Sequence, residues 1–185
     1  MIDKKSIRKD ILERRAALTP EEVKKRSRVM TTHLLSWLPR SAVRSIFLYA
    51  PIRNEPDLTG LIELCPDMIF SMPVVISPTQ MEFYAVDAST SYTGNRWGIL
   101  EPDDKNRGQI SAADLNTLII KPAVAADVNG YRLGYGAGFY DRYLVDSRAK
   151  HMIAVFAEFI LPTLPHEKHD IKANFILSEG GVGEC

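Results

Sequence analysis

Residues 130–142 read GYRLGYGAGFYDR, and this run holds the groups of the chain that are best suited to chemistry. Glycines alternate with other residues there, so the backbone can take positive φ angles and let a ligand come close. The arginines Arg132 and Arg142, the bare backbone N–H groups and the carboxylate of Asp141 suit a magnesium-bound polyphosphate. The neighbouring aromatic rings suit a flat organic partner.

Taken alone, these glycines are more typical of a tight turn that leads into a helix than of a ligand-binding loop. The run lacks the lysine of a P-loop and the spacing of a dinucleotide-binding fingerprint. A purely structural turn, however, has no need of Arg132, Tyr140, Asp141 and Arg142 together. We therefore interpret the run as a ligand-binding loop.

Two helices are expected at the N-terminal end of the chain. Residues 3–18 form an amphipathic pattern in which basic side chains lie beside an apolar stripe. These basic side chains are Lys4, Arg8 and Arg15. A second helix is expected to begin after Thr19, which can form a capping box with Glu22, and to run to about Leu38, before Pro39.

Short apolar runs predict strands at residues 45–50, 68–75, 81–86, 117–120, 152–156 and 175–177. Further helices are expected at residues 57–64 and 139–145. This alternation predicts an α/β fold, with a single domain over residues 1–185 built on an open, mostly parallel sheet with helices on both faces. Ligands in such folds bind at the carboxyl ends of strands, and the glycine loop follows the strand that ends near Ala123.

Composition narrows the classes of function. The chain has 185 residues, 45% of them hydrophobic, and its 23 Lys+Arg balance its 23 Asp+Glu. Zero net charge argues against a nucleic-acid partner, including an RNA bound through the basic N-terminal helix. With no membrane-length apolar run and no signal-peptide core, we expect a cytoplasmic monomer without a membrane partner. Neither the cysteines nor the histidines near Asp170 have the further partners that a zinc site needs.

Residues 132–142 resemble the signature of the 5-formyltetrahydrofolate cyclo-ligase family, also called methenyltetrahydrofolate synthetases. Other segments agree with that family in order along nearly the whole chain. They are the basic residues 4–8 (KKSIR), Glu55 after the first strand, residues 97–102 (WGILEP) and residues 164–170 (LPHEKHD). Five ordered matches make coincidence a poor explanation.

The resemblance implies an enzyme that uses ATP and Mg²⁺ to convert 5-formyltetrahydrofolate into 5,10-methenyltetrahydrofolate, with release of ADP and phosphate. The formyl oxygen takes the γ-phosphate of ATP. N10 of the folate then attacks the formyl carbon, and the ring closes as phosphate leaves. The alternative is a nucleotide- or phosphosugar-binding protein on a related α/β scaffold. Such a protein would keep the glycine loop but would need neither Glu55 nor Trp97.

The resemblance also assigns residues to ATP. The two catalytic candidates are Arg132, which would offset charge on the transferring phosphoryl group, and Tyr140. The residues assigned to ATP lie on the N-terminal helix and the glycine loop: Lys4, Arg8, Arg132, Leu133, Gly134, Tyr135, Gly136, Ala137, Gly138, Phe139 and Tyr140. Either Arg14 or Arg15 is a candidate for a further basic partner. The alternative for the basic helix is a solvated face.

For the folate, the resemblance assigns Ala50, Glu55, Trp97 and Tyr140. Glu55 would accept hydrogen bonds from the amino and ring N–H groups of the pterin. Whether Ala50 or Leu48 is the matching residue depends on where a gap is placed when the chain is matched to the family pattern. The metal ligands assigned by resemblance are Asp141 and Asp170, and two carboxylates suit magnesium, which fills its shell with waters and phosphates.

Overall fold

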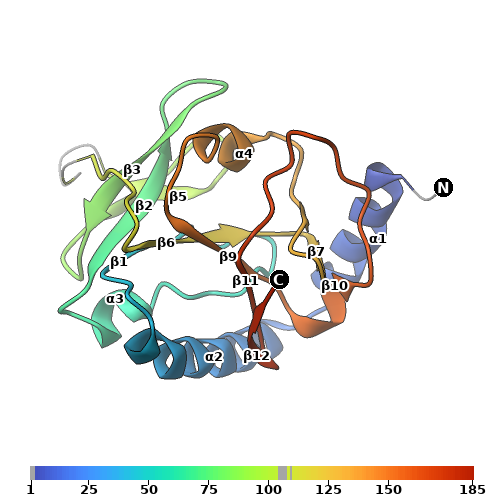
Figure 1. Ribbon diagram of the computed structural model, residues 1–185, viewed down its shortest axis with the longest axis horizontal. Helices are drawn as coiled ribbons and strands as arrows, with labels where there is room; N and C mark the ends of the chain where they lie inside the picture. The colour runs from blue at the N-terminus through green and yellow to red at the C-terminus, as the bar shows by residue number, and fades with distance from the viewer. Residues whose placement is uncertain (1–2, 104–107, 109) are drawn as a thin grey trace.

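The computed structural model describes residues 3–103, 108 and 110–185, and it is built around one seven-stranded sheet (Figure 1). In spatial order the strands are β12 (Gly181–Glu184), β11 (Phe175–Ser178), β9 (Lys150–Ala154), β6 (Thr117–Pro122), β1 (Ser45–Phe47), β2 (Ile69–Val75) and β3 (Met81–Val86). Pairing is parallel from β11 to β2, and only the edge strands β12 and β3 pair antiparallel. The predicted open, mostly parallel sheet is confirmed.

Alternate residues of the central strands belong to two separate cores, because successive side chains of a strand point to opposite faces. Ile46 and Leu118 join the larger core, which includes side chains of α1 (Lys4–Ala16) and α2 (Pro20–Trp37). Phe47 and Ile119 join the smaller core, against which α4 (Phe139–Tyr143) packs. Figure 1 shows α2 along one side of the sheet and α4 on the other, so helices cover both faces as expected.

The caps of the first two helices are set by short-range side chains. Asp3 caps α1 by accepting a hydrogen bond from the Ser6 N–H at 2.7 Å. Thr19 and Glu22 form the predicted capping box at the start of α2, and the short 3₁₀ helix η1 (Leu38–Arg40) follows its end. Glu22 accepts from the backbone N–H of Thr19 at 2.8 Å.

Several predicted elements are shorter than expected, among them the helix predicted over residues 139–145, which is α4 and ends at Tyr143. The helix predicted over residues 57–64 is only α3 (Leu61–Leu64), because the Asp57 carboxylate accepts from the backbone N–H and the hydroxyl of Thr59 and holds a turn instead. The strand predicted over residues 45–50 ends at Phe47. Residues 48–50 stay buried as the chain leaves the sheet.

Short strands outside the main sheet were not predicted. They are β7 (Ala125–Asp127), β8 (Arg132–Leu133) and β10 (Ile160–Leu161) in one sheet, and β4 (Tyr92–Gly94) with β5 (Leu100–Pro102) in another; the 3₁₀ helix η2 (Ala157–Phe159) precedes β10. The Asp127 carboxylate holds the β7–β8 turn by accepting from the N–H groups of Asn129 and Tyr131, each at 3.0 Å. The glycine loop therefore follows β8 rather than the strand ending near Ala123. Among the described residues, no helix has both the length and the apolar character to cross a membrane.

Candidate active site

The glycine loop between β8 and α4 uses its glycines in two different ways. Gly136 and Gly138 have φ angles of 104° and 68°, which residues that carry a side chain rarely adopt. A Cβ on Gly134 would lie 2.5 Å from Nη1 of Arg132, so the guanidinium at the end of that flexible side chain would have to shift. The loop thus exposes its backbone and allows the Arg132 guanidinium to fold against it.

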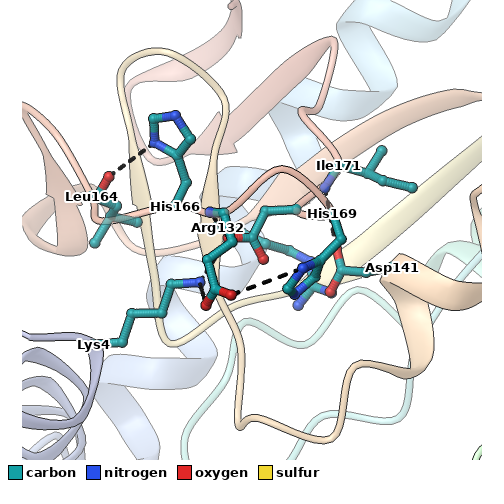
Figure 2. Close-up of polar contacts among 9 residues, drawn as sticks. Lys4, Arg132, Asp141, Leu164, His166, His169 and Ile171 are labelled. Atoms are coloured by element: carbon teal, nitrogen blue, oxygen red, sulfur yellow. Dashed lines mark hydrogen bonds and ion pairs between the residues drawn. The ribbon is translucent and has the colours of Figure 1, made fainter.

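Arg132 and Asp141, two residues predicted to take part in the chemistry, are paired with each other. Nη2 of Arg132 donates to Oδ2 of Asp141 at 2.8 Å, and the other carboxylate oxygen faces the N–H of Ile171 at 3.4 Å (Figure 2). Nε of Arg132 is buried and has no hydrogen-bond partner among the described residues. A buried donor without a partner is uncommon and is a feature of sites that take a ligand.

Lys4 and Asp170 form a second pair beside the first. Nζ of Lys4 lies 2.7 Å from Oδ2 of Asp170 and 3.2 Å from Oε1 of Glu167 (Figure 2). Partial burial opposes ionisation of Asp170, but the hydrogen bonds from Lys4 and from the Glu167 N–H outweigh it and hold the pKa of Asp170 below its usual value. The carboxylate is therefore ionised at neutral pH.

The two candidate metal ligands lie on adjoining segments. Asp170 directly precedes Ile171, whose N–H faces the Asp141 carboxylate. No cluster of three or more His, Cys, Asp or Glu side chains fit to hold a metal occurs among the residues that the structure describes. Two carboxylates without a third protein ligand fit magnesium, which takes phosphate oxygens and waters for the rest of its shell. They do not fit a structural zinc site.

Helix α1 also contacts the glycine loop directly. Nε of Arg8 donates to the carbonyl oxygen of Gly134 at 2.8 Å, and a Cβ on Gly136 would lie 3.9 Å from its Nη2. Lys4 and Arg8 are one helical turn apart and thus on the same side of α1, with Arg8 against the loop and Lys4 against Asp170. The alternative of a solvated basic face does not describe these two side chains.

Glu55 lies at the centre of a buried polar group. It is 2% exposed; Oε2 accepts from the Ile52 N–H at 3.0 Å, whereas Oε1 has no hydrogen-bond partner among the described residues. Burial raises the pKa of Glu55 to about 7, against the opposing effect of the Ile52 N–H and the Arg15 cation. Tyr140 is similar: its hydroxyl lacks a partner within the described part of the chain, and burial raises its pKa.

The other predicted folate residues are placed differently. Ala50 is buried in the larger core, 8% exposed, at the end of the segment that follows β1. Trp97 lies between β4 and β5 and is 51% exposed. The contact described for its ring is with the guanidinium of Arg96, 3.9 Å from the ring centroid, and not with the glycine loop.

The remaining loop residues serve the loop itself. Leu133 is 3% exposed, in the larger core, and the carbonyl oxygen of Ala137 accepts from Nη2 of Arg142 at 2.8 Å. The Phe139 ring lies 5.3 Å from the Arg142 guanidinium. Arg142 thus braces the loop instead of facing Arg132 and Asp141.

Two cations of this region are buried, which the sequence did not reveal: Arg15 was predicted only as an alternative to Arg14 for the ATP site, and Lys121 was not predicted at all. Arg15 is 1% exposed and contacts both the Glu55 loop and Tyr135, whereas Arg14 is half exposed and pairs with acidic side chains. Lys121 on β6 is fully buried, and its Nζ donates to the carbonyl oxygen of Ile171 at 3.1 Å. The signal that could have revealed Lys121 is its position directly after the apolar run 117–120.

Comparisons with known proteins show the family to which the chain belongs. A family model described as the 5-formyltetrahydrofolate cyclo-ligase family matches residues 1–179. A 5-formyltetrahydrofolate cyclo-ligase of Mycoplasma pneumoniae is 27% identical over 183 residues, covering 96% of this chain and 99% of the relative. The Escherichia coli K12 cyclo-ligase is 31% identical over 138 residues, covering 72% of this chain and 75% of the relative. The solved structure of the Aquifex aeolicus 5,10-methenyltetrahydrofolate synthetase is similar with a TM-score of 0.84 and 28% identity, covering 98% of this chain and 92% of that one.

Proposed function

The chain belongs to the 5-formyltetrahydrofolate cyclo-ligase family, and we propose on this basis how its residues convert 5-formyltetrahydrofolate into 5,10-methenyltetrahydrofolate with ATP. The observation that carries the proposal is the meeting of α1 with the glycine loop. Arg8 binds the Gly134 carbonyl across 126 positions of sequence, and Lys4 reaches Asp170 in the same region. Motifs that are far apart in the chain thus supply one site.

On the nucleotide side, backbone N–H groups of the glycine loop, residues 132–140, would hold phosphate oxygens, and Lys4, Arg8 and Arg132 would offset their charge. The unpartnered Nε of Arg132 supports this role. Asp141 and Asp170 would hold Mg²⁺, which when bound screens the phosphate charge.

On the folate side, Glu55 would receive the pterin. Its unpartnered Oε1 is a free acceptor in a buried place, and the pterin presents adjacent amino and ring N–H donors. Tyr140 would pack on the pterin or the formyl group, and its unpartnered hydroxyl is close enough to Glu55 for that carboxylate to influence its pKa. Ala50 and Trp97 would complete the contacts with the folate.

The chemistry then needs the two substrates in contact. The formyl oxygen attacks the γ-phosphorus, and ADP leaves as Arg132 offsets the charge on the transferring group. N10 attacks the activated carbon and gives up its proton, and the C–O bond breaks as phosphate departs and carries that proton away. Phosphorylation is required because an amide oxygen is otherwise a poor leaving group.

We also propose that the enzyme acts as a cytoplasmic monomer on a small-molecule folate, without nucleic-acid or membrane partners. The balanced charge of 23 basic and 23 acidic residues supports the absence of a nucleic-acid partner. Light scattering at micromolar concentration tests the monomer, and a dimer mass would contradict it.

The direct test of the function is the absorbance of the methenyl product after the protein is mixed with 5-formyltetrahydrofolate, ATP and Mg²⁺. Product is expected only with all three present. Folded protein that binds ATP but makes no product would instead support the nucleotide- or phosphosugar-binding alternative. Omission of Mg²⁺ in the presence of a chelator tests the metal separately.

A further inference from the structure

Arg15 on α1 is a fully buried cation whose hydrogen bonds join three segments of the chain. Its Nε donates to the carbonyl oxygen of Arg53 at 2.9 Å, and its Nη1 donates to that of Ala123, also at 2.9 Å. Its Nη2 donates to the hydroxyl of Tyr135 in the glycine loop. One guanidinium thus contacts the loop before Glu55, the chain just after β6 and the proposed nucleotide loop.

The segment before Glu55 is held in an unfavourable conformation. Arg53 and Asn54 have φ angles of 48° and 59°, which residues other than glycine rarely adopt. Such strain persists only where the surroundings enforce it. Here Arg15 binds the Arg53 carbonyl, and the Asn54 amide donates to the carbonyl oxygens of Arg15 and Leu18 at 3.0 Å each. The end of α1 therefore fixes where Glu55 lies.

Arg15 also lies next to the free oxygen of Glu55. The distance from its Nη2 to Oε1 is 3.9 Å, and both side chains are 1% exposed. This is too long for a hydrogen bond, so Oε1 keeps its capacity to accept one. At this distance in a buried place, the cation still stabilises the charged form of the carboxylate.

We propose that Arg15 is a positioning residue for the folate site: it presents Glu55 as a charged acceptor for the pterin and ties this acceptor to the glycine loop through Tyr135. The inference rests on the proposed function, in which Glu55 binds the pterin. The hydrogen bond of Arg15 to the proposed nucleotide loop ends on the side-chain hydroxyl of Tyr135, and not on a backbone N–H group that would hold phosphate.

The charge balance at Glu55 gives the proposal a measurable signature. Burial raises the pKa of Glu55 to about 7, and the Ile52 N–H, Arg15, Tyr135 and Arg53 oppose that rise. The other titratable groups that interact with this carboxylate are Tyr49 and Tyr140. Without the Arg15 cation the pKa of Glu55 is expected to rise by about one unit or more, because an opposite charge within ~4–6 Å is typically responsible for roughly 1–3 units.

The test compares Arg15→Gln, Arg15→Lys and the exposed neighbour Arg14→Met. At pH 7, Arg15→Gln is expected to raise the KM for 5-formyltetrahydrofolate roughly fivefold, because a one-unit rise leaves about a tenth of Glu55 ionised instead of half. The KM for ATP should change less than twofold. At pH 9 most of the added loss should disappear, whereas a merely distorted site would stay impaired. Arg15→Lys should restore the pH midpoint, and Arg14→Met should match the unsubstituted protein.

A second measurement does not depend on turnover. Carbon-13 NMR of the Glu55 carboxyl group, assigned with Glu55→Gln, should show a higher midpoint in Arg15→Gln and a nearly normal one in Arg15→Lys. An unsubstituted protein that makes no methenyl product refutes the proposed function, while this titration still reports on Arg15. Equal midpoints in the unsubstituted and Arg15→Gln proteins would overturn the proposal.

If Arg15→Gln does not fold, Arg15→Lys decides. A lysine cannot donate to three separated acceptors at once, so the folate KM should rise several-fold with the ATP KM unchanged. A folate KM equal to that of the unsubstituted protein would overturn the proposal.

Discussion

Replacing Glu55 with glutamine is expected to stabilise the folded protein at pH 8 and to weaken folate binding. The side chain is 2% exposed, and burial raises its pKa from 4.5 to about 7. A group whose pKa is raised on folding contributes stability that is fully present below the unfolded value and is lost as pH rises through the folded value. At pH 8 the unsubstituted protein therefore carries the whole cost of a buried carboxylate.

The size of the effect follows from the shift. A displacement from 4.5 to about 7 corresponds to about 3 kcal/mol in the free energy of unfolding. Glutamine resembles the protonated carboxyl group, since it is uncharged and its oxygen can still accept from the Ile52 N–H. The variant should gain up to about 3 kcal/mol at pH 8 and almost nothing near pH 4.5. Loss of the charged hydrogen-bond pair with the pterin should cost roughly 1.5–3 kcal/mol, or about one to two decades of folate affinity.

Urea unfolding at pH 5 and pH 8 measures the first effect, and separate calorimetric titrations with 5-formyltetrahydrofolate and ATP measure the second. The control is Glu63→Gln, whose carboxylate is exposed on α3. A stability difference that is equal at both pH values would show that Glu55 does not bear the buried charge. An ATP affinity that falls as much as the folate affinity would refute its assignment to the pterin.

Three further substitutions test other parts of the site. Asp141→Asn should lower turnover far more than stability, since it removes a proposed magnesium ligand. Near-normal turnover at ordinary Mg²⁺ concentrations would contradict the metal assignment. The control is Asp146→Asn, at an exposed position. Gly134→Ala should lower kcat with little change in unfolding temperature, because the added Cβ would lie 2.5 Å from the flexible end of Arg132; an unchanged kcat would argue against that arginine. Burial lowers the pKa of Lys121 from 10.5 to about 7, so the stability of the unsubstituted protein should rise with pH between these two values. Lys121→Met should remove this rise and add on the order of 3 kcal/mol to the free energy of unfolding at pH 7. Denaturant unfolding from pH 7 to 10 checks this, and parallel curves for the two proteins would refute it.

Local chemistry explains which parts of the fold could be predicted from the sequence. The Thr19–Glu22 capping box and the apolar runs of the central strands act over a few residues, and the structure confirms them. The three-stranded small sheet has no such signal, because β8 and β10 are only two residues long and the partner of β10 lies more than thirty residues earlier in the chain. The helix predicted over residues 57–64 is wrong over its first half, because the Asp57 carboxylate holds a competing turn with Thr59.

The same distinction between local and long-range determinants applies to the candidate site. The glycine loop could be predicted because adjacent residues of the sequence determine its φ angles and supply its charges. The burial of Arg15 could not, because periodicity places an arginine of an amphipathic helix on its basic flank and does not say that the chain after β6 covers it. The burial of Lys121 depends likewise on the segment of Ile171, which lies 50 residues later in the chain.

The charges of the proposed nucleotide site pair with one another, and this determines how a ligand can enter. Arg132 pairs with Asp141, and Lys4 pairs with Asp170. A charge that loses its partner in a partly buried place is costly, so a ligand of one sign would leave two groups unpaired. Magnesium-ATP carries both signs: its phosphates suit the two cations and its metal suits the two carboxylates. Binding then exchanges one set of partners for another and leaves no charge unpaired, so on this argument ATP and Mg²⁺ should each bind more weakly when the other is absent.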